Sequence, residues 1–266
     1  MSAPAASVRR PSALAVFLSV LWRDLFVTGR EMPVFLAQVV LQPLFMLFVF
    51  GKVLSSLGYT RPGYTELLFP GVVALTATLT ALQSTALPLV IEFSFTKEIE
   101  DRLLAPIPVA LVAVEKMVFA AMRALTAALF MFPIGILILG SVPWRAGALP
   151  QFAVVLVLGS LVGAAMGLTM GTMVPPNRIT IMFTLVLTPL LFTGCSQYPW
   201  PSLSSLPWFQ VVTAFNPLTY VSEGMRGALV PAVPHIRAPI CIGALLLSLA
   251  IFSVIGIRGF MRQAID

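Results

Sequence analysis

Long stretches without any charged residue limit what this chain can fold into more than any other feature. Residues 32–51 and 67–91 contain no Asp, Glu, Lys or Arg, and a helix needs about 20 apolar residues to cross the hydrocarbon of a membrane. Of the 266 residues, 59% are hydrophobic and 10% are charged, with a mean hydropathy of +0.99. Soluble domains carry about 25% charged residues. A soluble enzyme and a disordered chain are therefore excluded, and we expect an all-α integral membrane protein.

Six windows are expected to form transmembrane helices, which places residues 1–266 in a single domain. The windows are 32–51, 67–91, 117–139, 152–173, 179–194 and 238–257. The uncharged stretch continues beyond the fifth window, but Pro199, Pro201, Pro207 and Pro217 do not fit one continuous helix. We therefore expect broken or re-entrant helices between the fifth and sixth spans, packed on protein rather than on lipid.

Residues 1–31 are expected to form a cytoplasmic N-terminus with an interfacial helix. Five apolar residues repeat at the spacing of one helical face: Leu14, Phe17, Leu18, Leu21 and Leu25. Trp22 and the neighbouring arginines suit the headgroup region. No small-x-small cleavage pattern precedes the charged residues, so a cleaved signal peptide is not expected.

The placement of Lys and Arg predicts the orientation. With the N-terminus in the cytoplasm, the inner segments carry twice as many basic residues as the outer segments. The outer set is Lys52, Arg61, Arg145, Arg226 and Arg237. The positive-inside rule then places both termini in the cytoplasm. It also accounts for the net charge of +6 without a nucleic-acid partner, because the charges are spread in ones and twos.

Two ionisable residues lie in or beside the predicted spans. Arg123 is inside the third window, where a charge is costly and usually faces protein or water. Two interpretations remain open: its side chain snorkels to the cytoplasmic interface, or it acts in substrate binding or gating. Glu92, at the inner end of the second window, is a candidate partner for Arg123.

Residues with metal-binding or redox chemistry are few. Two cysteines, Cys195 and Cys241, and one histidine, His235, provide neither a disulfide scaffold nor a metal-ligand cluster. The sequence leaves a disulfide between the two cysteines open. No G-x-x-x-x-G-K-[ST] phosphate loop is found, so nucleotide hydrolysis would have to come from another chain.

The segment between the second and third windows is the most charged part of the chain. Residues 93–106 predict a short amphipathic helix that Thr96 caps and Pro106 limits. Its apolar residues include Phe95, Ile99 and Leu103, and its charged residues are Lys97, Glu98, Glu100, Asp101 and Arg102. Two interpretations remain: a solvated loop with a Glu98–Arg102 pair, or a docking surface for a soluble partner.

The segment 185–230 carries most of the remaining polar and aromatic features. Tyr198, Trp200, Trp208 and Tyr220 are placed to form an aromatic belt at the outer interface. Asn216 before Pro217 predicts the start of a helix. Glu223 and Arg226 are three residues apart and can pair on one helical face. By themselves these features describe a structural outer cap.

Small residues in the fourth window predict close helix packing. Gly159 and Gly163 form a G-x-x-x-G pair, with Ser160, Ala164 and Gly167 beside them. We favour packing against another span of the same chain, and a seam between two copies is the alternative.

In their order along the chain, these motifs resemble the permease subunits of type-2 ABC exporters, with the daunorubicin-resistance permeases as the nearest group. The resemblance rests on Phe69-Pro70-Gly71-Val72, Glu100, Arg102-Leu103-Leu104, Pro106, Glu115-Lys116, Pro189 to Gly194, Tyr198-Pro199, Leu206 to Phe209, Asn216 to Tyr220, Glu223 and Arg226. The chain departs from the family at Glu98-Ile99, where Gly-Thr is common, and at Glu115, where Gly usually precedes the Lys.

The resemblance implies a transport subunit that is not itself an enzyme. Such permeases pair as homodimers or heterodimers in the bacterial plasma membrane, and each binds a separate ABC ATPase that uses ATP and Mg²⁺. The ATPase would grip a cytoplasmic coupling helix between spans two and three, here Phe95, Lys97, Glu98, Glu100, Asp101, Arg102, Leu103 and Pro106. The family's outer motif corresponds to Gly194, Tyr198, Pro199, Asn216, Pro217, Tyr220, Glu223 and Arg226. The expected role is drug-resistance efflux of a small amphipathic drug-like, antibiotic or lipid-like substrate, with no cofactor bound by this chain.

Two other function classes fit the residues less well. An ion-coupled secondary transporter usually keeps carboxylates at the middle of the bilayer, and no Asp or Glu lies in the middle of any predicted span. An intramembrane metalloprotease would need H-E-x-x-H, which one histidine does not supply. The secondary transporter remains the main alternative.

Overall fold

The described part of the chain is entirely helical in its regular structure. The structure, a computed structural model, describes residues 13–60, 62–93, 108–175 and 178–264. The longer helices are α1 (Ala13–Arg30), α2 (Met32–Met46), α4 (Tyr64–Ile91), α6 (Val109–Leu139), α7 (Leu149–Met173), α8 (Ile179–Thr193) and α11 (Ala238–Gln263). The shorter elements are η1 (Leu47–Val53), α3 (Leu54–Ser56), η3 (Ala146–Ala148), η5 (Trp200–Ser205), α9 (Pro207–Ala214) and α10 (Pro217–Leu229).

Five helical stretches of the described chain are long and apolar enough to cross a membrane. They are Met32–Ser56, Tyr64–Ile91, Val109–Leu139, Ala146–Met173 and Ala238–Gln263. The first combines α2, η1 and α3 in one rod. The fifth predicted window, 179–194, forms α8, whose 15 residues make it shorter than these five.

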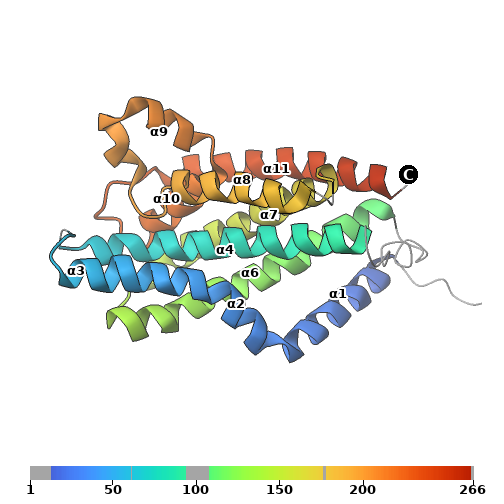
Figure 1. Ribbon diagram of the computed structural model, residues 1–266, viewed down its shortest axis with the longest axis horizontal. Helices are drawn as coiled ribbons and strands as arrows, with labels where there is room; N and C mark the ends of the chain where they lie inside the picture. Colours follow the sequence, from blue (N-terminus) through green and yellow to red (C-terminus); the bar gives the residue numbers. More distant parts are fainter. Residues whose placement is uncertain (1–12, 61, 94–107, 176–177, 265–266) are drawn as a thin grey trace, which may run out of the picture.

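The long helices run side by side between two ends of the molecule (Figure 1). The ends of α4 and α11 lie at the same end as the start of α6, and η5 and α9 lie at the opposite end. We call the first end inner and the second outer, after the orientation expected from the charges. α1 is tilted away from the bundle at the inner end (Figure 1).

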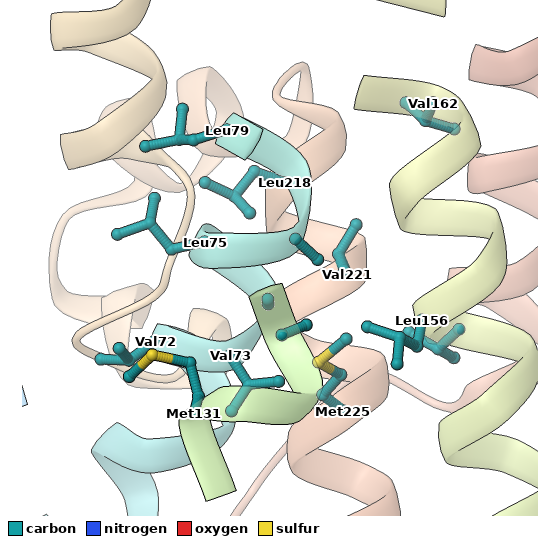
Figure 2. Packing of buried hydrophobic residues seen from close by; sticks show 14 of the residues in the cluster. Val72, Val73, Leu75, Leu79, Met131, Leu156, Val162, Leu218, Val221 and Met225 are labelled. Atoms are coloured by element: carbon teal, nitrogen blue, oxygen red, sulfur yellow. The ribbon is translucent and has the colours of Figure 1, made fainter. Parts of the chain in front are cut away.

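α4 is the central helix of the bundle. It packs against α2, α6, α7 and α10, and most of its residues are buried. Figure 2 shows Val72, Val73 and Leu75 of α4 in one cluster with Met131 of α6 and residues of α7 and α10. A buried helix in a membrane protein needs apolar residues on all its faces, which explains why α4 has no charged residue between Leu67 and Ile91.

The glycines of α7 let it approach α4 closely. A Cβ added to Gly163 would lie 2.5 Å from the Thr78 carbonyl oxygen, and one added to Gly167 would lie 2.4 Å from that of Leu82. Gly159 instead contacts Val221 of α10. These contacts confirm that the small residues of the fourth window pack within the chain.

α6 begins earlier than the predicted third window. Its first residue is Val109 rather than Met117, so about two turns of helix precede the apolar window. The prediction treated Glu115 and Lys116 as residues outside a span because they are charged. Both are buried against neighbouring helices instead.

The exposed surfaces of the long helices are apolar. They include Phe45 and Phe48 on the first rod, Leu137 on α6, Leu185 on α8 and Leu247 on α11. Between α8 and α11 the chain forms η5, α9 and α10 rather than one helix, as the prolines of that segment require.

Candidate functional site

Two fully buried charged residues meet at the outer end of the bundle. Glu223 and Arg226 lie one turn apart on α10, and Arg226 Nη1 donates to Glu223 Oε1. Neither side chain is exposed to solvent. The structure therefore confirms the pair predicted from their spacing. Because both side chains are buried, removing one charge would leave the other without compensation.

The remaining hydrogen bonds of this pair go to backbone groups from four segments. Glu223 accepts from the amides of Trp200 and Ile236, each at 2.9 Å. Arg226 donates through Nη2 to the Cys195 carbonyl at 2.9 Å and through Nε to the Leu67 carbonyl at 3.5 Å. We call the six residues Leu67, Cys195, Trp200, Glu223, Arg226 and Ile236 the outer junction. It ties α4 and α10 to the loops before η5 and α11.

Asn216 connects the start of α10 to the end of α8. Its side-chain oxygen accepts from the Leu218 amide at 2.9 Å, and Pro217 follows it at the first helical position. This is the helix start predicted from the sequence. The Asn216 amide group also donates to the Leu190 carbonyl at 3.0 Å and to Thr193 Oγ1 at 2.9 Å.

Other residues of the outer motif make backbone contacts in the same region. Tyr198 donates its hydroxyl proton to the Phe192 carbonyl, and Tyr220 donates to that of Ala214 at 2.8 Å. Pro199 precedes η5. A Cβ added to Gly194 would lie 2.3 Å from the Leu218 side chain. The outer motif is thus one hydrogen-bonded and packed unit.

The turn after α8 lies directly against α4. A Cβ added to Gly71 would lie 1.8 Å from the Ser196 carbonyl oxygen, so only glycine fits there. Cys195 has a φ of 50°, a left-handed conformation that is uncommon for residues other than glycine. That conformation accompanies the Cys195 carbonyl bond to Arg226.

Burial changes the acidity of two groups in this turn. It raises the pKa of the Cys195 thiol to about 11, although a hydrogen bond with Thr219 acts in the opposite direction. It also raises the pKa of Tyr198 to about 12. Both side chains therefore stay protonated at neutral pH. Cys195 and Cys241 are free thiols in the structure, which does not pair them.

A second buried ion pair lies at the inner end of the bundle. Glu92 follows the last residue of α4, and its Oε1 accepts from Lys116 Nζ of α6 at 2.5 Å. The proposed pairing of Glu92 with Arg123 is therefore wrong. The true partner is 24 residues away in the sequence, a separation that helical spacing does not reveal.

Arg123 lies further along α6 and packs on aromatic rings. Its guanidinium carbon is 4.2 Å from the centroid of Phe35 and 5.8 Å from that of Phe119. Such contacts partly replace the hydration of the cation.

The predicted coupling helix falls outside the described residues. This applies to Phe95, Lys97, Glu98, Glu100, Asp101, Arg102, Leu103 and Pro106. The structure does describe the helices on either side, and the Glu92–Lys116 pair joins the end of α4 to the first turns of α6. The two ends of the charged segment are therefore attached to helices that are held together.

No metal-binding group of three or more His, Cys, Asp or Glu residues is found in the described part of the chain. Sequence reasoning found Glu223 and Arg226 but missed their backbone partners at Trp200 and Ile236. Backbone amides and carbonyls are present at every position, so a sequence does not show which of them bind a side chain. The left-handed conformation of Cys195 and the close contact at Gly71 are also hard to predict, because both depend on how the turn after α8 packs against α4.

The comparison with known proteins agrees with this arrangement. Residues 15–230 match the family model described as ABC-2 type transporter. A relative in Cyanophora paradoxa, named "Putative transport permease ycf38", is 26% identical over 219 residues, which cover 79% of this chain and 72% of the relative. A protein of the same name in Porphyra purpurea is 26% identical over 220 residues, with the same coverage. With a match that covers most of its length, the chain belongs to the ABC-2 type transporter family.

Proposed function

We propose that this chain is the membrane-spanning permease subunit of an ATP-driven exporter. A separate ABC ATPase hydrolyses ATP with Mg²⁺, and two permeases, identical or different, form the translocation path. The substrate is a small amphipathic drug-like, antibiotic or lipid-like compound. The protein spans the bacterial inner membrane six times, with α8 as the fifth and shortest span and both termini in the cytoplasm.

One observation supports this proposal above the others: α4 connects the charged inner segment to the outer junction. Residues 94–107 begin three positions after the last residue of α4, and the Leu67 carbonyl near the other end of α4 accepts from Arg226. A helix of 28 residues is about 42 Å long. Because α4 is buried along most of that length, we expect a displacement of α4 to shift the helices packed against it.

The mechanism follows from this connection. ATP closes the two ATPase subunits, and their closure pushes the coupling helix formed by residues 95–106. The Glu92–Lys116 pair passes the displacement to both α4 and α6. At the outer end, the outer junction shifts α10 and the adjacent turns with α4, and a path opens between the two permeases.

The test is transport into inside-out membrane vesicles that contain the protein with its native partners. A panel of amphipathic fluorescent dyes serves as substrates. The proposal predicts accumulation that requires hydrolysable ATP and continues when a protonophore collapses the proton gradient. Accumulation that needs the proton gradient and proceeds without ATP would contradict it and favour an ion-coupled secondary transporter.

A further inference from the structure

A cavity of about 750 Å³ at the inner end is lined by five charged residues. It lies between α1, α4 and α6. Its lining includes Arg23 and Asp24 of α1, Glu92, and Lys116 and Arg123 of α6. Charged residues among apolar helices are costly, and those that are present usually pair with one another or mark a functional site.

Two residues that line this cavity each have a buried polar atom without a hydrogen-bond partner among the described residues. Glu92 is 8% exposed, and while its Oε1 binds Lys116, its Oε2 accepts no hydrogen bond. The Nε of Arg123 is also buried and donates to no acceptor. No salt bridge joins Arg123 to another described residue. Such atoms cost free energy unless a ligand satisfies them.

The other charges of the cavity are already paired. Arg23 binds Asp24 at 3.1 Å, and Lys116 binds Glu92. A fitting ligand must therefore bring a negatively charged acceptor to Arg123 and a positively charged donor to Glu92 Oε2. A phosphate joined through a short linker to a primary ammonium group has both.

The position of the cavity indicates where such a ligand comes from. α1 beside it exposes three large apolar residues one turn apart, Leu18, Trp22 and Phe26, and Trp22 is 70% exposed. This face suits contact with lipid at the interface. Lys116 and Arg123 are seven residues apart, which places them about 10 Å apart along α6. A separation of about 10 Å is long enough for a lipid headgroup and the first methylenes of the acyl chains.

We propose that this cavity binds the headgroup of an inner-leaflet phospholipid that carries a primary amine, such as phosphatidylethanolamine. The phosphate accepts from Arg123, and the ammonium donates to Glu92 Oε2. The site is separate from the outer junction and does not depend on the direction of transport.

The test measures binding to the purified full-length protein, with its native partners, in a mild detergent. Phosphatidylethanolamine, phosphatidylcholine, phosphatidylglycerol and inorganic phosphate are added separately. Retained lipid is counted by native mass spectrometry, and the melting temperature is followed during each titration. We expect phosphatidylethanolamine to bind about tenfold more tightly than phosphatidylcholine, which has no N–H donor for Glu92.

Variants locate the site. Arg123→Gln is expected to weaken binding of phosphatidylethanolamine about tenfold, whereas Arg258→Gln, on an exposed arginine at the inner end of α11, leaves it unchanged. Glu92→Gln removes the preference for the amine. If that variant does not fold because Lys116 is left unpaired, the double variant Glu92→Gln/Lys116→Met replaces it.

Three results would overturn the proposal. The first is equal binding by the wild type and Arg123→Gln. The second is an equal loss of binding in Arg258→Gln, which would indicate general lipid attachment. The third is a rise in melting temperature with inorganic phosphate as large as that with phosphatidylethanolamine, which would make this a site for a free phosphate.

Discussion

Glu223 and Arg226 hold the outer end together mainly through backbone groups. Their side chains contact the amides of Trp200 and Ile236 and the carbonyls of Cys195 and Leu67. The two amides and the Cys195 carbonyl lie in irregular segments or at a helix start, where helical hydrogen bonds do not satisfy them. The Leu67 carbonyl lies in the first turns of α4, where Arg226 is an additional donor to it. The pair thus neutralises two buried charges and completes the hydrogen bonding of the outer turns.

Replacing one member of this pair should be costly. Arg226→Gln leaves the Glu223 carboxylate buried without its cation, and we expect a loss of about 3–5 kcal/mol in stability. The melting temperature in detergent measures it. Arg237→Gln, on an exposed arginine close by in the sequence, is the matched control and should melt like the wild type. The double variant Glu223→Gln/Arg226→Gln should lose less than the sum of the two single changes. An unchanged melting temperature in Arg226→Gln would contradict the account.

The Cys195 thiol should be unreactive at ordinary pH. Because burial raises its pKa to about 11, only about a thousandth of the thiols are ionised at pH 8. In a Cys241→Ser background, maleimide labelling of Cys195 should be far slower than labelling of a cysteine placed at exposed Leu206. Its rate should rise as the pH approaches 11, where the raised pKa no longer keeps the thiol protonated. Equal labelling at pH 8 would show that Cys195 is not buried as the structure has it.

Side-chain spacing along one helix was the part of the site that the sequence could predict. The Glu223–Arg226 pair and the Asn216 cap both follow from residues a few positions apart, and both were found. The Glu92–Lys116 pair joins two helices. To predict this pair one must know which residues of α4 and α6 lie side by side, and a local sequence pattern does not give that information.

At the scale of elements, the close packing of α4 against α7, which we call the seam, depends on glycines of α7 that have no side chain. Gly163 and Gly167 bring the α7 backbone against the carbonyls of Thr78 and Leu82. Helices in a membrane gain little from the hydrophobic effect when they associate, so close van der Waals packing of this kind contributes much of the attraction.

A larger side chain at this seam should separate the two helices. In Gly163→Val, the added Cβ alone would lie 2.5 Å from the Thr78 carbonyl oxygen, and overpacking of this kind costs about 1–3 kcal/mol. Thermal melting in detergent measures the loss. Ala153→Val introduces the same side chain on an exposed position of α7 and should have little effect. If the two variants melt alike, the seam is not closely packed.

The helices themselves were largely predictable because hydropathy and prolines mark them. Met32, Ile91, Leu139, Met173, Ile179 and Ala238 are helix ends in both the prediction and the structure. The start of α6 was missed because charge was taken as a sign of exposure. Burial of Lys116 depends on Glu92, and tertiary pairing of this kind overrides composition.

At the scale of the whole molecule, α4 links the two ends on which the proposed mechanism depends. The outer junction binds its outer end, and the Glu92–Lys116 pair fixes its inner end to α6. The proposed mechanism needs a soluble ATPase to bind the charged segment between α4 and α6. The central claim is that an ABC ATPase binds there.

Affinity purification of the chain from its native membrane in mild detergent tests this claim most directly. The co-purifying proteins are identified and quantified by mass spectrometry for the wild type and for Glu100→Ala/Arg102→Ala. We predict an ATPase with a phosphate-binding loop in near-equal amount with the wild type, and its loss from the double variant although that variant still inserts into the membrane. A chain that purifies without an ATPase, or a double variant that retains it fully, would contradict the account.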